Sequence, residues 1–226
     1  MNDNQGLFKK IIIEFNKKGI LLDLILIGSW CLVIYREYFN RPPEIPLLRT
    51  VDLDFLVPNP PKITTEVDIP NLLKSYGFDE EFSVLGGFSK FVHPELEIEF
   101  LTPEYGRGRR TSHNITELKI SAQGLRYVGL VQQYNIEVMY IKTMIRVPEP
   151  SAFVLLKFIT STKRKEKAKI ERDISTAKQV GEYLITQPHQ KVKMKEIYSF
   201  MPKRWQTTCL DIIRQNSYSL YKVLLS

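Results

Sequence analysis

An apolar segment that carries two aspartates, TVDLDFLVP beginning at Thr50, constrains the fold of this chain more than any other feature. Its hydrophobic residues predict a β-strand, although aspartate is disfavoured in strands. Because side chains of a strand alternate between two faces, Val51, Leu53 and Phe55 share one face, and Asp52 and Asp54 share the other with Thr50. The strand is therefore expected to bury one face in a core and to present two carboxylates on the other.

A second segment, LEIEF, repeats this alternation with Glu97 and Glu99 on one face. If the two strands are neighbours, three or four carboxylates converge on one side of a sheet, where like charges raise each other's pKa. A divalent cation relieves this repulsion, and oxygen ligands around a partly hydrated ion are typical of Mg²⁺, or of Mn²⁺. Two such ions can hold the attacking and leaving oxygens of a phosphoryl displacement. The alternative is that LEIEF is a strand whose polar face is solvated.

The dipeptide Gly28-Ser29 stands between a predicted strand, in LLDLILIGS, and a predicted helix, WCLVIYREYF. Backbone amides at such a turn are free, and the N-terminus of a helix is positive. A triphosphate can be held there without a charged side chain. Gly-Ser at a strand–helix junction is common by itself, and the Asp-x-Asp strand that follows makes the combination specific.

The chain changes character near residues 147–150. Before this point, predicted helices such as 7–20 alternate with predicted strands, including a hairpin that turns near His93-Pro94. After Pro148 the sequence is charged and helical, with no strong turn signal before Gln187-Pro188. We therefore expect an α/β (α+β) fold, with a mixed β-sheet and flanking helices in residues 1–147 and a helical domain in residues 148–226.

Composition sets broad limits on the function. The 32 lysines and arginines exceed the 25 acidic residues, giving a net charge of +7, which favours a nucleotide or nucleic acid as partner or serves solubility alone. No run of about 18 apolar residues predicts a membrane span, and the N-terminal stretch does not resemble a signal peptide. The distant Cys31 and Cys209 lie in apolar surroundings, so reduced thiols are expected. These features favour a cytoplasmic protein without a membrane partner.

The order of strand, Gly-Ser, helix, Asp-x-Asp strand and later acidic strand resembles the polymerase-beta-like nucleotidyltransferase superfamily. The motif of that superfamily is a hydrophobic residue and Gly-[Gly/Ser], a spacer, Asp-hydrophobic-[Asp/Glu]-hydrophobic, and a third carboxylate further on. Its positions fall here on Gly28, Ser29, Asp52, Asp54 and either Glu97 or Glu99. Glu99 suits the third position better, because it directly precedes the apolar pair Phe100-Leu101.

A narrower resemblance concerns the segment PEPSAFVLLKFITSTKRKEKAKIERD. It is similar to the helical part of small bacterial nucleotidyltransferase-fold proteins, including those grouped with abortive-infection toxins. In these proteins a proline precedes a helix with a lysine, then an arginine, then a lysine and aspartate. The matching residues are Pro150, Lys157, Arg164, Lys169 and Asp173. Together the two resemblances span roughly residues 20 to 185.

The resemblance implies a metal-dependent nucleotidyltransferase, which moves a nucleoside monophosphate from an NTP to an acceptor hydroxyl and releases pyrophosphate. The acceptor is a protein, an RNA or a small molecule. The implied metal ligands, for Mg²⁺ or Mn²⁺, are Asp52, Asp54 and Glu99, with Glu97 in reserve. Glu99 is also implied to help deprotonate the acceptor.

The remaining site residues are expected to bind the nucleotide. The resemblance places the β- and γ-phosphates at Gly28 and Ser29. Lys157 interrupts the apolar run FVLLKFI, as a snorkelling or site-facing lysine does, and Arg164 follows seven residues later on the same expected helix face. Thr50 shares the face of the carboxylates and is expected to support the site. The alternative for the basic stretch KRKEKAK is a solvated helix with local salt bridges.

Three departures from the superfamily pattern keep a second function open. The spacer from Ser29 to Asp52 is 23 positions and long, Trp30 follows Gly-Ser where a small residue is common, and the third acid is a glutamate. The alternative is a catalytically inactive nucleotidyltransferase fold that acts as a binding or regulatory module for a nucleotide or RNA, with a toxin–antitoxin or phage-defence role. A glycine- and arginine-rich loop, YGRGRRTSH, is a further candidate to grip phosphates or RNA.

Overall fold

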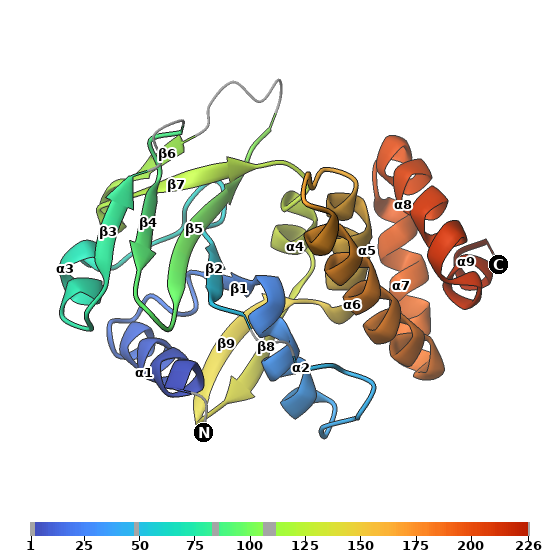
Figure 1. The fold of residues 1–226 in the computed structure, drawn as a ribbon, viewed down its shortest axis with the longest axis horizontal. Helices are drawn as coiled ribbons and strands as arrows, with labels where there is room; N and C mark the ends of the chain where they lie inside the picture. The colour runs from blue at the N-terminus through green and yellow to red at the C-terminus, as the bar shows by residue number, and fades with distance from the viewer. Residues whose placement is uncertain (1–2, 48–49, 83–85, 106–111, 226) are drawn as a thin grey trace.

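The protein combines a mixed β-sheet with a set of packed helices, as seen in a computed structural model that describes residues 3–47, 50–82, 86–105 and 112–225 (Figure 1). Its strands are β1 (Ile25–Ile27), β2 (Asp52–Leu56), β3 (Asp79–Phe82), β4 (Ser89–Val92), β5 (Glu97–Pro103), β6 (Ser112–Ile115), β7 (Ile120–Leu125), β8 (Asn135–Tyr140) and β9 (Thr143–Pro148). The arginine-rich loop, with Arg107, Arg109 and Arg110, lies outside the described residues.

The helices of the described residues fall into three groups, with one before the first strand, three between strands and the rest after the last strand. They are α1 (Asp3–Lys17), α2 (Cys31–Tyr38), α3 (Ile69–Lys74), α4 (Gly129–Gln133), α5 (Pro150–Ser161), α6 (Lys167–Thr186), α7 (Pro188–Phe200), α8 (Lys203–Asn216) and α9 (Tyr218–Leu225), with short 3₁₀ turns η1 (Gly28–Trp30) and η2 (Thr116–Leu118). This mixed sheet with flanking and C-terminal helices confirms the predicted fold class. The division into domains at residues 147 and 148 stays a prediction, and β9 ends at Pro148 just before α5 begins.

The main sheet has the strand order β1-β2-β5-β4-β3 within the described part of the chain, with β7 beside β5 and β6 beside β7. β2 runs parallel to β5, and β5 runs parallel to β7, whereas the other pairs are antiparallel. The two acidic segments are therefore neighbouring strands, which meets the condition under which their carboxylates converge on one side of the sheet. The hairpin of β4 and β5 also turns where His93-Pro94 predicted it.

Aromatic packing on one face of the sheet explains the alternation in β2 and β5. The ring of Phe15 on α1 lies 5.2 Å from that of Phe55 and 6.4 Å from that of Phe100, between ring centroids. Phe55 and Phe100 are themselves 5.9 Å apart and fully buried. Because α1 covers this face, the carboxylates of β2 and β5 point to the opposite one.

Contacts of α2 with α5 and with the last residue of β9 join the helical part to the α/β part. The Tyr35 hydroxyl donates to the carbonyl of Pro148 at 2.8 Å, and its ring meets that of Phe153 edge-on at 5.4 Å. Within the helices, α6 approaches α5 and α9 closely at Gly181, where an added Cβ would lie 2.8 Å from a methyl of Leu220. These contacts fix how the helices face the sheet.

The basic stretch does not form one continuous helix, so that prediction was wrong. α5 ends at Ser161 and α6 begins at Lys167, with the connector 162–166 between them. The hydroxyls of Thr160, Ser161 and Thr162 each donate to a backbone carbonyl of the preceding turn, and such bonds compete with helix continuation. The positive charges that follow repel one another, and the chain folds back so that α6 packs against α5 (Figure 1).

Three single residues test smaller expectations. Trp30 does not crowd the Gly-Ser turn, because its ring is buried and stacks on Phe8 at 4.2 Å. Cys31 and Cys209 are free and buried, as predicted, and burial raises the pKa of both thiols. Among the helices that the structure describes, none combines the length and apolar character needed to cross a membrane.

Candidate active site

The carboxylates lie in register on β2 and β5. Asp52 is paired with Glu97, and Asp54 with Glu99, in the parallel ladder. Side chains at paired positions of neighbouring strands point to the same face, so the four carboxylates lie together on the face of the sheet opposite α1. Asp52 is exposed at the start of β2, and Asp54 is only partly accessible.

The Gly-Ser turn lies directly beside these four carboxylates. Ile27 at the end of β1 pairs with Asp54, and η1 begins at the next residue. Gly28 has φ of +72°, and a Cβ there would overlap the carboxylate Oδ2 of Asp54. Both observations require glycine at position 28, since other residues rarely adopt this φ and none has room. The turn that was expected to hold phosphates therefore lies against the carboxylate of Asp54.

The charge state of Asp54 reflects its crowded surroundings. Burial, followed by the charges of Glu99 and Asp52, raises the pKa of this carboxyl to about 7, while the charges of Lys157 and Arg164 act in the opposite direction. Carboxylates that compete for protons in this way are suited to share a divalent cation. The two cations identified from the sequence also lie close enough to Asp54 to act on it.

A lysine that the sequence did not single out forms salt bridges with two of the four carboxylates. Lys90 on β4 is paired in register with Glu99, and its ammonium forms a salt bridge with Glu97 and lies 3.6 Å from Glu99 Oε1. The hydrogen bond to Glu97 is the main reason that the pKa of Lys90 is raised. Glu97 is thus engaged by Lys90 more closely than Glu99, which leaves Glu99 the better partner for Asp54. Cross-strand register revealed this lysine, and the sequence contained no signal for it.

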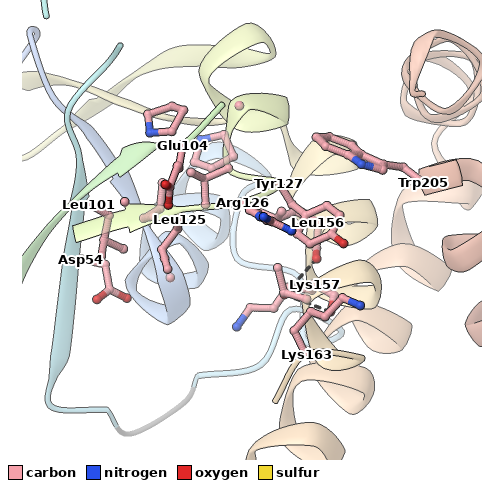
Figure 2. A pocket seen from close by; sticks show the side chains of 18 of the residues that line it. Asp54, Leu101, Glu104, Leu125, Arg126, Tyr127, Leu156, Lys157, Lys163 and Trp205 are labelled. Atoms are coloured by element: carbon pink, nitrogen blue, oxygen red, sulfur yellow. Dashed lines mark hydrogen bonds between the residues drawn. The ribbon is translucent and has the colours of Figure 1, made fainter. Parts of the chain in front are cut away.

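A cleft of about 850 Å³ lies between the sheet and the helices, next to Gly28 and Asp54. Of the predicted site residues, it is lined by Gly28, Asp54, Lys157 and Arg164. Figure 2 shows Asp54 on the strand side of the cleft and Lys157 on the helical side. The volume lies in the range of small-molecule and cofactor sites. The other predicted residues do not line the cleft, namely Ser29, Thr50, Asp52, Glu97 and Glu99.

The position of Thr50 indicates a local role at the start of β2. Its hydroxyl accepts a hydrogen bond from the backbone N–H of Asp52 at 3.3 Å, and its carbonyl accepts one from the amide of Asn4 at 3.3 Å. Both contacts fix the backbone that carries the first carboxylate. Thr50 therefore holds the start of β2 from outside the cleft, and its support of a catalytic site stays a prediction.

Asp173 on α6 brings the two predicted cations together. Its Oδ1 lies 2.6 Å from Lys157 Nζ, and its Oδ2 lies 3.2 Å from Arg164 Nε. The side chains of Asp173 and Lys157 are only 6% and 12% exposed, whereas Arg164 is 49% exposed. Lys157 and Arg164 lie close together because both form salt bridges with the buried Asp173. They do not share the helix face that the sequence had suggested, because α5 ends before Arg164.

Sequence reasoning missed several residues that line the cleft. Tyr127 and Arg126 follow β7, and Arg204 and Trp205 lie at the start of α8. Lys163, in the connector after α5, also lines the cleft. These residues come from segments far apart in the chain, and no local pattern connects them. Only the packing of the helices against the sheet places them together.

A divalent cation at this site would have few protein ligands. In the described residues, no group of three or more His, Cys, Asp or Glu side chains is arranged to enclose a metal ion. Mg²⁺ does not need such a cage, because it commonly binds through one or two carboxylates, water and the phosphates of a substrate. Asp54 with Asp52 or Glu99 provides such a set, and the charges of Glu99 and Asp52 add to burial in raising the pKa of Asp54.

Comparison with known proteins identifies the class. A family model described as "Nucleotidyltransferase" matches residues 7–199, so the chain belongs to this nucleotidyltransferase family. Nucleotidyl transfer is therefore its general class of chemistry, and a nucleotide its general class of ligand. A search of curated proteins gave no match. The narrower resemblance to abortive-infection toxins stays a prediction.

Two solved structures are similar to the chain at low identity. An antigenic nucleotidyltransferase-like protein from Paracoccidioides brasiliensis is 11% identical, with 98% of this chain and 92% of that chain covered and a TM-score of 0.48. A tRNA nucleotidyltransferase complexed with a primer tRNA and an incoming ATP analog is 15% identical, with 91% of this chain and 60% of that chain covered and a TM-score of 0.25.

Proposed function

We propose that the protein is a metal-dependent nucleotidyltransferase, which transfers a nucleoside monophosphate from an NTP to an acceptor hydroxyl. One observation carries this proposal. A single cleft of about 850 Å³ joins Gly28 and Asp54 on the sheet side to Lys157 and Arg164 on the helical side. Anionic phosphates fit the amides and cations of this cleft, and the carboxylates provide the oxygen ligands for a counterion.

In this proposal the residues of the chain act mainly by positioning charge. Lys157 and Arg164, held by Asp173, bind the triphosphate, and the backbone at Gly28 and Ser29 holds its β- and γ-phosphates. Mg²⁺ or Mn²⁺ bound by Asp52, Asp54 and Glu99 would supply positive charge next to the reacting phosphate. Orientation and charge neutralisation then provide most of the rate enhancement.

The proposed reaction forms a bond from the acceptor oxygen to the α-phosphorus and breaks the bond from that phosphorus to the bridging oxygen. Pyrophosphate leaves with the electron pair of the broken bond. Glu99 accepts the proton of the acceptor hydroxyl, because it is paired with Asp54 and less closely held by Lys90 than Glu97 is. The acceptor is a protein, an RNA or a small molecule.

The experiment that tests this function combines binding and chemistry. Calorimetry with each of the four NTPs, with and without Mg²⁺, is expected to show binding that needs the metal in the wild type and is lost in Asp54→Asn. Incubation with α-labelled NTPs and candidate acceptors should then release pyrophosphate and label the acceptor. Asp79→Asn, an exposed substitution on the edge strand β3, is the matched control and should behave as the wild type.

A specific observation also supports a second function, that of an inactive nucleotide- or RNA-binding module. Lys90 neutralises Glu97 and approaches Glu99, so the third carboxylate is already partnered within the chain. In that case an NTP binds equally well without Mg²⁺, and no pyrophosphate is released with any acceptor. Binding that survives chelation of the metal by EDTA decides for the module and against the enzyme.

A further inference from the structure

Lys90 lies on the carboxylate face of the sheet, on the strand next to β5 (Figure 1). It is paired with Glu99 in the antiparallel ladder of β4 and β5, so the two side chains project from the same face. The next residue, Phe91, belongs to the other face, where its buried ring meets that of Phe100 edge-on at 6.1 Å. This aromatic contact in the core fixes the face on which Lys90 stands.

The ammonium of Lys90 is directed toward the candidate site. On the other side of β4, the exposed Glu81 of β3 is also a register partner of Lys90. The ammonium nevertheless forms a salt bridge with Glu97 and lies 3.6 Å from Glu99 Oε1, both on β5. Lys90 thus has an acidic strand on each side, and its charge is placed at the strand that contributes to the site.

The contact of Lys90 with β5 is partly shielded from water. The side chains of Lys90, Glu97 and Glu99 are 29%, 30% and 29% exposed. The surface pair of Lys167 and Glu171 is 90% and 67% exposed. Salt screens partly buried charges much less than exposed ones. The ammonium is therefore a persistent positive charge among the carboxylates of the site.

Lys90 divides the four carboxylates into two unlike pairs. It engages Glu97 and approaches Glu99, whereas Asp52 and Asp54 on β2 form no salt bridge within the described residues. A divalent cation needs free carboxylate oxygens, so an ion bound to Glu97 would have to displace the ammonium. An ion beside the ammonium would be repelled by a like charge. The face therefore offers one place for a divalent cation, on the side of β2.

We propose that Lys90 takes the place of one of the two divalent cations that can act in a phosphoryl displacement, so that the protein works with a single divalent cation. This inference rests on the proposed function, in which Asp52, Asp54 and Glu99 bind that cation. Lys90 holds Glu97 and supplies a fixed positive charge beside Glu99, which accepts the proton of the acceptor hydroxyl. The lysine is thereby a positioning residue of an active site.

The test counts the ions bound to the full chain. The probes are Mn²⁺ and the α,β-methylene analogues of the four NTPs, in which a carbon replaces the bridging oxygen, so that no pyrophosphate is released. With protein in slight excess over the analogue that binds most tightly, the electron paramagnetic resonance signal of free Mn²⁺ gives the number of bound ions per nucleotide. The wild type is expected to bind one Mn²⁺.

Variants of Lys90 test whether the lysine sets this number. Lys90→Met keeps the aliphatic stem and removes the charge, so it is expected to bind two Mn²⁺ per nucleotide, twice the number of the wild type. Lys90→Arg keeps the charge and should bind one. Glu81→Gln is the matched control, because it removes the other register partner of Lys90, and it should also bind one.

A second readout is the shape of the spectrum of bound Mn²⁺. Two ions that share carboxylates lie about 4 Å apart and couple magnetically. The wild type should show an isolated ion, and Lys90→Met a coupled pair. Circular dichroism checks the fold of each variant, and Lys90→Gln replaces Lys90→Met if the latter does not fold.

The outcomes separate this inference from the proposed function. Two coupled Mn²⁺ in the wild type would overturn the inference and leave the proposed function standing. One Mn²⁺ in both the wild type and a folded variant without the charge would also overturn it, because Lys90 would then be a structural ion pair only. If the wild type binds none of the four analogues with Mn²⁺, the proposed function fails and the inference fails with it.

Discussion

The ammonium of Lys157 lies 2.6 Å from a carboxylate oxygen of Asp173, sixteen residues further along the chain and on the next helix. The pair is almost fully buried, and Asp173 also holds Arg164. Removing one partner of a buried ion pair leaves an uncompensated charge, which is strongly destabilising. Asp173 therefore fixes the turn from α5 to α6 and the positions of two cations at the cleft.

The first prediction concerns this ion pair. Asp173→Asn should lower the free energy of unfolding by about 3 kcal/mol, because Lys157 remains buried without a counter-charge. Urea unfolding followed by circular dichroism measures the loss. Glu171→Gln is the matched control, since the Lys167–Glu171 pair is exposed and should cost less than about 0.5 kcal/mol. Equal losses in both variants would contradict a structural role for Asp173.

A second prediction tests the close approach at Gly28. Gly28→Ala should destabilise the protein by roughly 2 kcal/mol, because its φ of +72° is unfavourable for alanine and the new Cβ overlaps Asp54. NTP binding should be lost with it. Gly6→Ala in α1 meets no atom within 4 Å and should stabilise the helix by about 0.5 to 1 kcal/mol. A Gly28→Ala protein as stable as the wild type would show that the turn is relaxed in solution.

The third prediction follows from the raised pKa of Asp54. Its pKa rises from 3.8 to about 7 on folding, so between these values the unfolded chain has lost a proton that the folded protein keeps. Stability from this group is present at low pH and is lost as the pH rises through about 7. In metal-free protein, Asp54→Asn should therefore be more stable than the wild type by up to roughly 4 kcal/mol above pH 7, and by little near pH 4.

Thermal unfolding of both proteins across this pH range measures the difference. Adding Mg²⁺ at pH 8 should raise the melting temperature of the wild type and not that of Asp54→Asn, because the ion binds only where the carboxylates are charged. A stability difference that does not change between pH 4 and pH 8 would mean that Asp54 titrates normally.

The fourth prediction distinguishes the two glutamates of β5. Glu99→Gln should reduce nucleotidyl transfer at least about tenfold, because Glu99 is the register partner of Asp54 and acts on its pKa. Glu97→Gln should have a smaller effect, since Glu97 is occupied by Lys90. Measuring the rate of pyrophosphate release by the two variants shows which glutamate is the third carboxylate. A larger loss in Glu97→Gln would make Glu97 the third carboxylate.

Local pattern was sufficient to predict the elements that build the site. The alternation in TVDLDFLVP and LEIEF predicted two strands with acids on one face, and β2 and β5 pair with Asp54 opposite Glu99. Gly28 was predicted at a strand–helix junction, which lies between β1 and α2. These predictions succeed because a strand has a period of two and one buried face, so sequence order fixes which side chains share a face.

The sequence by itself determined which residues carry charge and on which face of a strand they stand. Tertiary structure decided their partners. Lys90 meets Glu97 through a neighbouring strand, Asp173 joins Lys157 to Arg164 across a break between helices, and Tyr127 meets Trp205 from the far end of the chain. Such contacts depend on how elements distant in sequence pack. No local periodicity encodes that packing, because it follows from burying one complementary surface against another.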